Sequence, residues 1–343
     1  MTHKRWILTA LSFAAVIAVS LYFVLGWSRQ EGAANLWTAL PPIAHVLALG
    51  TVVIEVGARA LKLVWSAKAV GLRLPFGAAL RTCLGGDFGA AITPARSGSE
   101  PARFLILAES RLAPASVLVI LFAELFLEAL SLAIVVAAVA VIFSGAGRVL
   151  GALVGIVGGY SAFVLGVAVV AFLLSRRNAT GPAPRWARRL WINDARWRVV
   201  QRWLRNVHHT VDVVKDVDLR FAGLSLASSV VHVAIRLTVL PALVLTTAVG
   251  AGAPLAPLAL WPLGFLYGAA VVPAPGGGGA VEVAFRAALA GDIPHAIFGA
   301  ALLWWRFYTF YIYILLGGIA AGRTVLRALR KTEQMEEEFE TAA

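Results

Sequence analysis

Two of the long apolar stretches in this chain are interrupted by proline and glycine, and each then resumes as a helix that opens with glutamate and arginine. The first interruption reads TPARSGSEPARFLIL and begins at Thr93; the second reads VVPAPGGGGAVEVAFRAAL and begins at Val271. In lipid, unpaired backbone groups and buried charges are costly because no water satisfies them. One interrupted segment in each half of a chain is the pattern that indicates a transport site between inverted repeats. We therefore expect the fold to be organised around these two breaks.

The apolar runs themselves predict a protein that crosses a membrane many times. The chain is 60% hydrophobic and 14% charged, whereas soluble domains carry roughly 25% charged residues. We expect an all-α polytopic membrane protein with about six spanning helices plus two re-entrant helical hairpins in an inverted-repeat arrangement. The spanning candidates lie at about 7–26, 36–57, 115–143, 149–174, 221–249 and 295–322, and the hairpins at about 76–112 and 258–290.

A single integral membrane domain is expected to cover residues 1–332, followed by an acidic C-terminal tail at 333–343. Lys4 and Arg5 precede the first apolar run, which continues to about Gly26. That run is longer than the roughly 7–15 apolar residues of a cleaved signal. It is therefore expected to remain as a spanning helix.

The loop charges predict the orientation of the chain, because lysine and arginine are enriched on the cytoplasmic side. The basic N-terminus is expected in the cytoplasm, and the basic stretch from Arg59 to Arg81 belongs on the same side. The basic segment 176–218 also falls inside only if 76–112 turns back within the membrane. The C-terminus returns to the cytoplasm if 258–290 is a second hairpin that dips in from outside. The two hairpins are thus expected to enter from opposite faces.

Segment 176–218 combines tryptophan and aliphatic residues at helical spacing with a dense excess of arginine. Trp186, Trp197 and Trp203 belong to its apolar positions. This pattern predicts an amphipathic helix in the cytoplasmic interface, where tryptophan and arginine contact anionic headgroups. A plain connecting element and a lipid-recruiting or regulatory role both stay open.

Several classes of function are disfavoured by the composition. The net charge of +12 comes mostly from loops that flank apolar runs, where basic residues set topology, so nucleic-acid binding is not expected. Cys83 is the single cysteine, and the six histidines show no metal-ligand spacing. We therefore expect no disulfide, no metal and no cofactor.

Charged residues inside or beside the apolar runs are the candidates for function. Each costs roughly 2.5–3.5 kcal/mol near the middle of a bilayer, so they should pair with one another and face a shared polar cavity. Glu124 and Glu128 are four residues apart and lie on one helix face. Arg59 is near a membrane edge and could instead extend to the interface, whereas Arg306 lies well inside the last run. The charged positions are Glu55, Arg59, Asp87, Arg96, Glu100, Arg103, Glu124, Glu128, Arg236, Glu282, Arg286 and Arg306.

The candidate transport site combines charge with the starts of the two resumed helices. Helix N-termini expose unpaired N–H groups and carry the positive end of the dipole, which suits an anionic group such as phosphate. An equally open alternative is that Glu100–Arg103 and Glu282–Arg286 are neutralised pairs that stabilise the hairpins. The site residues we select are Arg96, Glu100, Arg103, Glu124, Glu128, Glu282, Arg286 and Arg306, and the hairpin-turn residues are Pro94, Gly98, Pro273, Pro275, Gly276, Gly277 and Gly279.

At these motifs the chain resembles the flippase-like transmembrane domain of lysylphosphatidylglycerol synthases and their stand-alone bacterial and archaeal relatives. The first signature of that family, Pro-x-x-x-Gly-x-(Asp/Glu)-x-x-Arg, is matched by Pro94, Gly98, Glu100 and Arg103. The second, Pro-x-Pro-Gly-Gly-x-Gly-x-x-Glu, is matched by Pro273, Pro275, Gly276, Gly277, Gly279 and Glu282. The middle-helix signature Glu-Arg-x-x-Asp is only partly kept, as Glu124, Leu125 and Glu128. Arg306 matches an arginine of the family's final helix.

The resemblance implies a lipid flippase rather than an enzyme, located in a bacterial or archaeal cell membrane. A lipid head group would cross through a polar cavity between the hairpins, downhill or coupled to an ion or proton gradient, because the chain has no ATP-binding loop. A secondary transporter of a small solute or ion is the first alternative, and a membrane enzyme acting on a lipid phosphate is the second. The expected partners are membrane lipids, either an anionic phospholipid or a polyprenyl phosphate lipid, with a homo-oligomer left open.

Overall fold

Helices make up every regular element that the computed structural model describes. The described residues are 35–93, 96–110, 112, 114–175, 197–198, 201, 217–269, 272, 274 and 277–324, together with 18, 19, 22, 25 and 26. Four described helices are long and apolar enough to cross a membrane, namely Ser116–Ile142, Gly147–Gly166, Leu219–Leu245 and His295–Thr324. The all-α membrane class is confirmed. Most of the predicted first span 7–26, almost all of segment 176–218 and the tail 333–343 lie outside the described residues.

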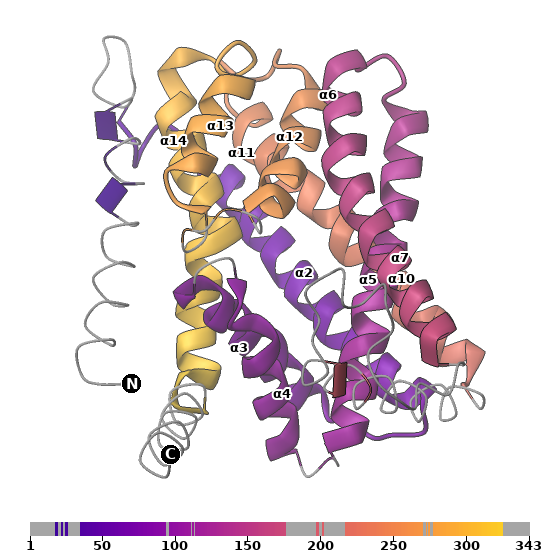
Figure 1. Cartoon of the computed structure of the whole chain (residues 1–343). Helices are drawn as coiled ribbons and strands as arrows, with labels where there is room; N and C mark the ends of the chain where they lie inside the picture. Colours follow the sequence, from indigo (N-terminus) through magenta and orange to yellow (C-terminus); the bar gives the residue numbers. More distant parts are fainter. Residues whose placement is uncertain are drawn as a thin grey trace.

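Helix α2 (Pro42–Ala69) runs diagonally through the middle of the molecule (Figure 1). Proline near its start suits a helix, because the first turn needs no N–H donor. The helix has 28 residues and continues well past the predicted end at position 57. Lys62, which we expected in a cytoplasmic loop, is fully buried within it. That expectation was wrong because we took the first basic residues as the end of the span. In the structure, Lys62 pairs with Glu124 and Glu128 on α5 (Pro114–Ile142), and α2 continues past it.

The first interrupted segment folds into two antiparallel helices, α3 (Phe76–Ile92) and α4 (Ser99–Glu109). Three glycines on α3 allow α4 to approach closely. A Cβ atom at Gly86 would lie 2.6 Å from the Arg103 side chain, and one at Gly89 would lie 2.5 Å from the carbonyl oxygen of Gly98. Gly85 is packed in the same way against Ile106. Later residues of α3 contact earlier residues of α4. The two helices are therefore antiparallel and form a tight helical hairpin.

The second interrupted segment has the same form, with α12 (Leu255–Gly268) and α13 (Ala280–Leu289). The rings of Phe265 and Phe285 lie 6.0 Å apart, and Gly277 packs against Ala269 nearer the turn. In Figure 1 the first pair of helices occupies the lower half of the molecule and the second pair the upper half. The two hairpins therefore point toward each other from opposite ends.

The remaining helices surround these hairpins. They are α5 (Pro114–Ile142), α6 (Gly147–Leu153), the π-helical turn η2 (Val154–Gly158), α7 (Gly159–Ser175), α10 (Leu219–Ile235), the 3₁₀ turn η3 (Arg236–Thr238), α11 (Val239–Leu245), α14 (His295–Arg306) and the π-helical turn η6 (Phe307–Tyr311). Helical structure continues after η6 as far as Thr324. Two of the irregular turns coincide with a charged residue: η3 begins at Arg236, and η6 follows Arg306 directly. Irregular turns within a helix are often found at functional sites.

Candidate functional site

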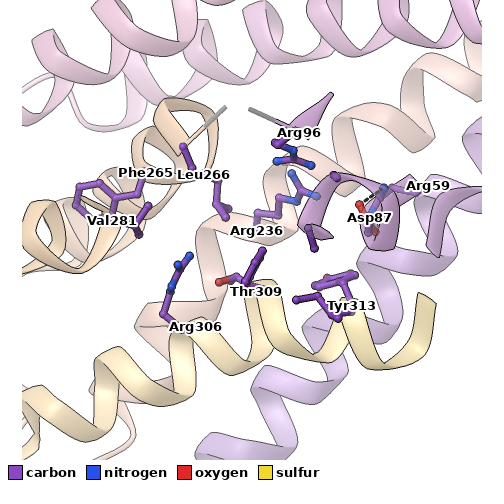
Figure 2. A pocket seen from close by; sticks show the side chains of 15 residues that line it. Arg59, Asp87, Arg96, Arg236, Phe265, Leu266, Val281, Arg306, Thr309 and Tyr313 are labelled. Atoms are coloured by element: carbon purple, nitrogen blue, oxygen red, sulfur yellow. Dashed lines mark hydrogen bonds and ion pairs between the residues drawn. The ribbon is translucent and has the colours of Figure 1, made fainter. Parts of the chain in front are cut away.

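A small cavity lies where the turns of the two hairpins meet (Figure 2). It measures about 60 Å³. The first hairpin contributes the end of α3 and Arg96, while the second contributes the end of α12 and the start of α13. Helix α2, turn η3 and the last helix close the remaining sides. The lining residues are Arg59, Asp87, Ala90, Ala91, Arg96, Arg236, Phe265, Leu266, Ala269, Val281, Arg306, Thr309, Phe310, Tyr313 and Ile314.

Arg59 and Asp87 join α2 to the first hairpin at one side of this cavity. Arg59 donates two hydrogen bonds to the carboxylate of Asp87, from Nη1 to Oδ2 at 2.6 Å and from Nη2 to Oδ1 at 2.9 Å. Both side chains are 12% exposed. A two-pronged arginine–carboxylate pair is a strong and geometrically specific contact. Arg59 therefore bonds inside the protein, and the alternative that it extends to the membrane interface does not describe this structure.

Arg236 reaches into the cavity from the 3₁₀ turn η3 and is held by Glu55 of α2. Its Nη2 and Nε atoms donate to Oε1 of Glu55 at 2.7 and 3.1 Å. Glu55 is 1% exposed, and it also accepts a hydrogen bond from the hydroxyl of Tyr313. Arg59 Nη1 lies 3.6 Å from the same carboxylate. One buried glutamate thus orients two of the cavity arginines, which removes the cost of leaving its charge unpaired.

Arg306 pairs with Glu282, so the last helix is tied to the second hairpin. The Nε atom of Arg306 donates to Oε1 of Glu282 at 2.8 Å. The other carboxylate oxygen, Oε2, accepts the backbone N–H of Gly279 at 2.7 Å, which satisfies one of the exposed donors at the start of α13. The guanidinium of Arg306 also lies 4.9 Å from the ring of Phe310, a cation–π distance.

Arg96 differs from the other three cavity arginines. It has an exposed side chain, and within the described part of the chain it makes no ion pair or hydrogen bond to a carboxylate. Its backbone adopts φ 58°. Among the described residues, Arg96 is the one residue other than glycine that has a positive φ. In Figure 2 its guanidinium points toward that of Arg236. A left-handed backbone at a residue with a Cβ is uncommon and tends to occur at functional sites.

A second cluster of charges lies outside the cavity lining and surrounds Lys62. The Nζ atom of Lys62 lies 3.1 Å from Glu124 Oε1 and 3.0 Å from Glu128 Oε2. Glu124 also pairs with Arg103 of α4, which bonds Glu100 at 3.2 Å. The hydroxyl of Tyr267 on α12 donates to Glu128 at 3.3 Å. This cluster therefore links the first hairpin, α2, α5 and the second hairpin, as a network in which each member has an opposite charge nearby.

The structure divides the predicted site residues between these two places instead of gathering them in one cavity. Arg96 and Arg306 line the cavity, and Glu282 lies directly behind Arg306. Glu100, Arg103, Glu124 and Glu128 belong to the second cluster, and Arg286 is exposed on α13. The Glu100–Arg103 contact fits the alternative of a pair that stabilises the hairpin.

The predicted turn glycines that the structure describes have clear physical roles. Gly277 and Gly279 have φ 66° and 82°, a region that glycine enters without a Cβ penalty. Gly98 lies against Gly89, since a Cβ on Gly98 would come within 2.7 Å of the Gly89 carbonyl oxygen. Pro94, Pro273, Pro275 and Gly276 lie outside the described residues.

Sequence reasoning left out five residues of these networks. Glu55, Arg59, Asp87 and Arg236 were named only as charged positions, and Lys62 was assigned to a loop. A signal was present for three of them, because positions 55, 59 and 62 follow helical spacing and share one face of α2. No metal-binding group of three or more histidine, cysteine or acidic side chains occurs in the part of the chain that the structure describes. What the cavity offers chemically is a cluster of guanidinium donors.

A family model described as "Lysylphosphatidylglycerol synthase TM region" matches residues 9–317. The match spans both hairpins, the cavity and the Lys62 cluster. A search of curated proteins finds no match to this chain.

Proposed function

The chain belongs to the family of lysylphosphatidylglycerol synthase transmembrane regions, and from this premise we propose that it is a flippase that moves a phosphate-bearing lipid between membrane leaflets. The family and the apolar helices make it a multi-pass membrane protein related to lipid handling. The finer proposal is that the head group passes through the cavity between the hairpins while the lipid tails stay in the bilayer.

The observation that carries this proposal is the set of four arginines at the junction of the two hairpin turns. Arg59, Arg96, Arg236 and Arg306 come from four different parts of the chain and line one cavity. Guanidinium groups bind phosphate oxygens with paired, directional hydrogen bonds. Three of the arginines, Arg59, Arg236 and Arg306, lie among apolar helices, where charges are rarely retained without a function.

The ion pairs around the cavity suggest how access could alternate between the two faces. Arg59–Asp87 connects α2 to the first hairpin, while Arg306–Glu282 connects the last helix to the second. Movement of one hairpin would loosen one pair and leave the other in place, which is the rocking expected of inverted repeats. In this proposal movement is downhill or coupled to a proton or ion gradient, in a bacterial or archaeal cell membrane with both termini cytoplasmic. A homo-oligomer is compatible with it.

A secondary transporter of a small anion is the second candidate, and the small cavity favours it. About 60 Å³ corresponds to roughly four to six water-sized volumes. That room suits a free inorganic anion as well as the charged group of a lipid. The two functions differ in whether a lipid tail moves with the charge.

Lipid movement in proteoliposomes tests the proposal. Purified protein is reconstituted with fluorescent lipids of different head groups, and dithionite accessibility reports movement with and without an imposed pH gradient. We expect an anionic phospholipid or a polyprenyl phosphate to move faster than in empty liposomes without ATP. If no lipid moves faster but labelled phosphate or sulfate enters the vesicles, the solute-transporter function replaces the flippase.

A further inference from the structure

We infer that the cavity recognises a phosphate monoester, a phosphate with a single substituent, and that Arg96 is the residue that binds it. For its lipid form this inference rests on the proposed function, since it names which phosphate-bearing lipids are moved. The chemistry of recognition, however, is shared by a lipid monoester and a soluble one. The argument comes from the charges, the backbone and the size of the site.

The first argument is the charge balance of the cavity. Arg59, Arg236 and Arg306 each have a bonded carboxylate, supplied by Asp87, Glu55 and Glu282. Arg96 has none within the described residues, so the cavity has one more guanidinium than carboxylate. The start of α4 lies just after Arg96 and adds the positive end of a helix dipole. Glu100 lies in that first turn and already faces the dipole, so a bound anion would balance the remaining excess of about one positive charge.

The second argument is the position of Arg96. In Figure 2 its guanidinium points toward that of Arg236. Two like charges held toward each other repel unless an anion lies between them. Arg236 uses Nε and Nη2 for Glu55, and among the described residues neither its Nη1 nor the guanidinium of Arg96 bonds a carboxylate, so these donors can bind a ligand. The three arginines with carboxylate partners form a fixed wall, and Arg96 completes the site.

The third argument is size together with the nature of the walls. A volume of about 60 Å³ accepts a phosphate group but little beyond it. The hairpin walls are mostly apolar, from Ala90, Ala91, Leu266, Ala269 and Val281. The other polar lining side chains are already bonded, Asp87 to Arg59, Tyr313 to Glu55 and Thr309 to the Trp305 carbonyl. The lining therefore offers few partners for the hydroxyl or amine groups of a glycerol or ethanolamine head group, and unpaired polar groups are costly there. A monoester presents only phosphate oxygens to the site and leaves its single substituent outside.

Arg96 is also the arginine that can be removed most cleanly. Replacing Arg306 would leave Glu282 buried without its partner, which destabilises a protein regardless of function. Removing Arg96 deprives no described carboxylate of a partner. Moreover, glycine adopts φ near 58° readily, so Arg96→Gly deletes the guanidinium while it relaxes the backbone. A structural role for Arg96 predicts a less stable variant, whereas a binding role predicts an equally or more stable variant that binds poorly.

The experiment compares monoesters with diesters, in lipid and soluble form, on the full-length protein. Phosphatidic acid and a polyprenyl phosphate are the lipid monoesters, and phosphatidylglycerol is the diester. Uptake of inorganic phosphate and glycerol phosphate is measured in the same proteoliposomes, and binding of each lipid is measured in nanodiscs. We expect the lipid monoesters to bind at least tenfold more tightly than the diester. Binding should strengthen as the pH rises through about 6, where a phosphate monoester loses its second proton.

The variants sharpen the test. Arg96→Gly should weaken monoester binding at least tenfold and keep or raise the thermal unfolding temperature, and Arg96→Lys should retain part of the binding. Arg148, an exposed arginine at the start of α6, provides the matched control, and Arg148→Gln should change neither quantity. A less stable Arg96→Gly protein, or equal binding of monoester by Arg96→Gly and wild type, would overturn the role of Arg96.

The outcomes separate the inference from the proposed function. If the protein moves phosphatidylglycerol as fast as phosphatidic acid, the monoester inference is wrong and the flippase stands. If monoesters bind through Arg96 and glycerol phosphate enters the vesicles, but no lipid moves, the inference stands with a soluble ligand and the flippase is wrong. If nothing binds and nothing moves, both are wrong.

Discussion

Arg306 and Glu282 form an ion pair in which both side chains are buried: the arginine side chain is 3% exposed and the glutamate side chain 0%. The two residues are 24 positions apart in the chain, and they join the last helix to the first turn of the second hairpin. Among buried side chains, each of these charges is stabilised by the other. The pair therefore holds the first turn of α13 against the last helix.

The first prediction is that breaking this pair costs more than removing it. Arg306→Met leaves the buried carboxylate of Glu282 without the arginine that bonds it, and should lower the free energy of unfolding by about 3–5 kcal/mol. The double variant Arg306→Met/Glu282→Gln should recover part of this loss, because no uncompensated charge remains. Thermal unfolding in detergent is measured for the wild type, the single variants Arg306→Met and Glu282→Gln, and the double variant. A double-mutant cycle then gives the coupling energy between the two side chains. Losses that simply add would show that the two side chains are not coupled.

The second prediction concerns Lys62. It lies between Glu124 and Glu128 at 3.1 and 3.0 Å, so Lys62→Met should leave Glu128 without its lysine and Glu124 with Arg103 alone, and destabilise the protein by about 3–5 kcal/mol. Lys68→Met is the matched control on the same helix, since Lys68 is exposed. It should change the unfolding temperature little. Equal effects of the two substitutions would contradict the buried position of Lys62.

The third prediction tests the close packing of the first hairpin. A methyl group at position 89 would meet the Gly98 carbonyl oxygen at 2.5 Å, so Gly89→Ala should lower stability by about 1–3 kcal/mol and slow transport. Gly77 lies on the same helix with nothing within 4 Å of its Cβ position, and Gly77→Ala should be neutral or stabilising by up to about 1 kcal/mol. Unfolding temperatures measure both. A tolerated Gly89→Ala variant would mean that α3 and α4 can separate at little cost.

The fourth prediction concerns topology. Arg73 precedes α3 and Gly291 follows α13, and both are exposed. A Cys83→Ala background removes the single native cysteine, which is itself buried. In cells, Arg73→Cys should be labelled by a membrane-impermeant thiol reagent only after the membrane is opened, and Gly291→Cys from outside without opening. Labelling of both positions from one face would exclude oppositely oriented hairpins.

Much of the helical framework could be predicted from local patterns. The predicted run 115–143 matches α5 (Pro114–Ile142), and the predicted glycine turn before Glu282 is built from residues with positive φ. Both follow from rules that act within a few residues, namely apolar length and the backbone freedom of glycine. Such features can therefore be predicted from short stretches of sequence.

The partners of the charged residues could not be predicted in the same way. Helical spacing identifies neighbours on one helix, as it does for Glu100 and Arg103. Lys62, however, bonds to carboxylates 62 and 66 positions later in the chain, which only tertiary packing brings near. For this reason the end of α2 predicted from sequence is too early. The residues of one ion-pair network were likewise assigned to separate segments of the chain.

The polar face of α2 also has a consequence for how the protein is made. Glu55, Arg59 and Lys62 lie within a single helix, and three charges at roughly 2.5–3.5 kcal/mol each oppose its entry into lipid by about 8–10 kcal/mol. Their partners lie on α3, α5 and η3, which are all synthesised later. We therefore expect α2 to insert poorly as an independent segment when it leaves the ribosome. Its insertion should be completed only as these later helices arrive, so the biogenesis of this protein is expected to be cooperative across helices that are far apart in translation.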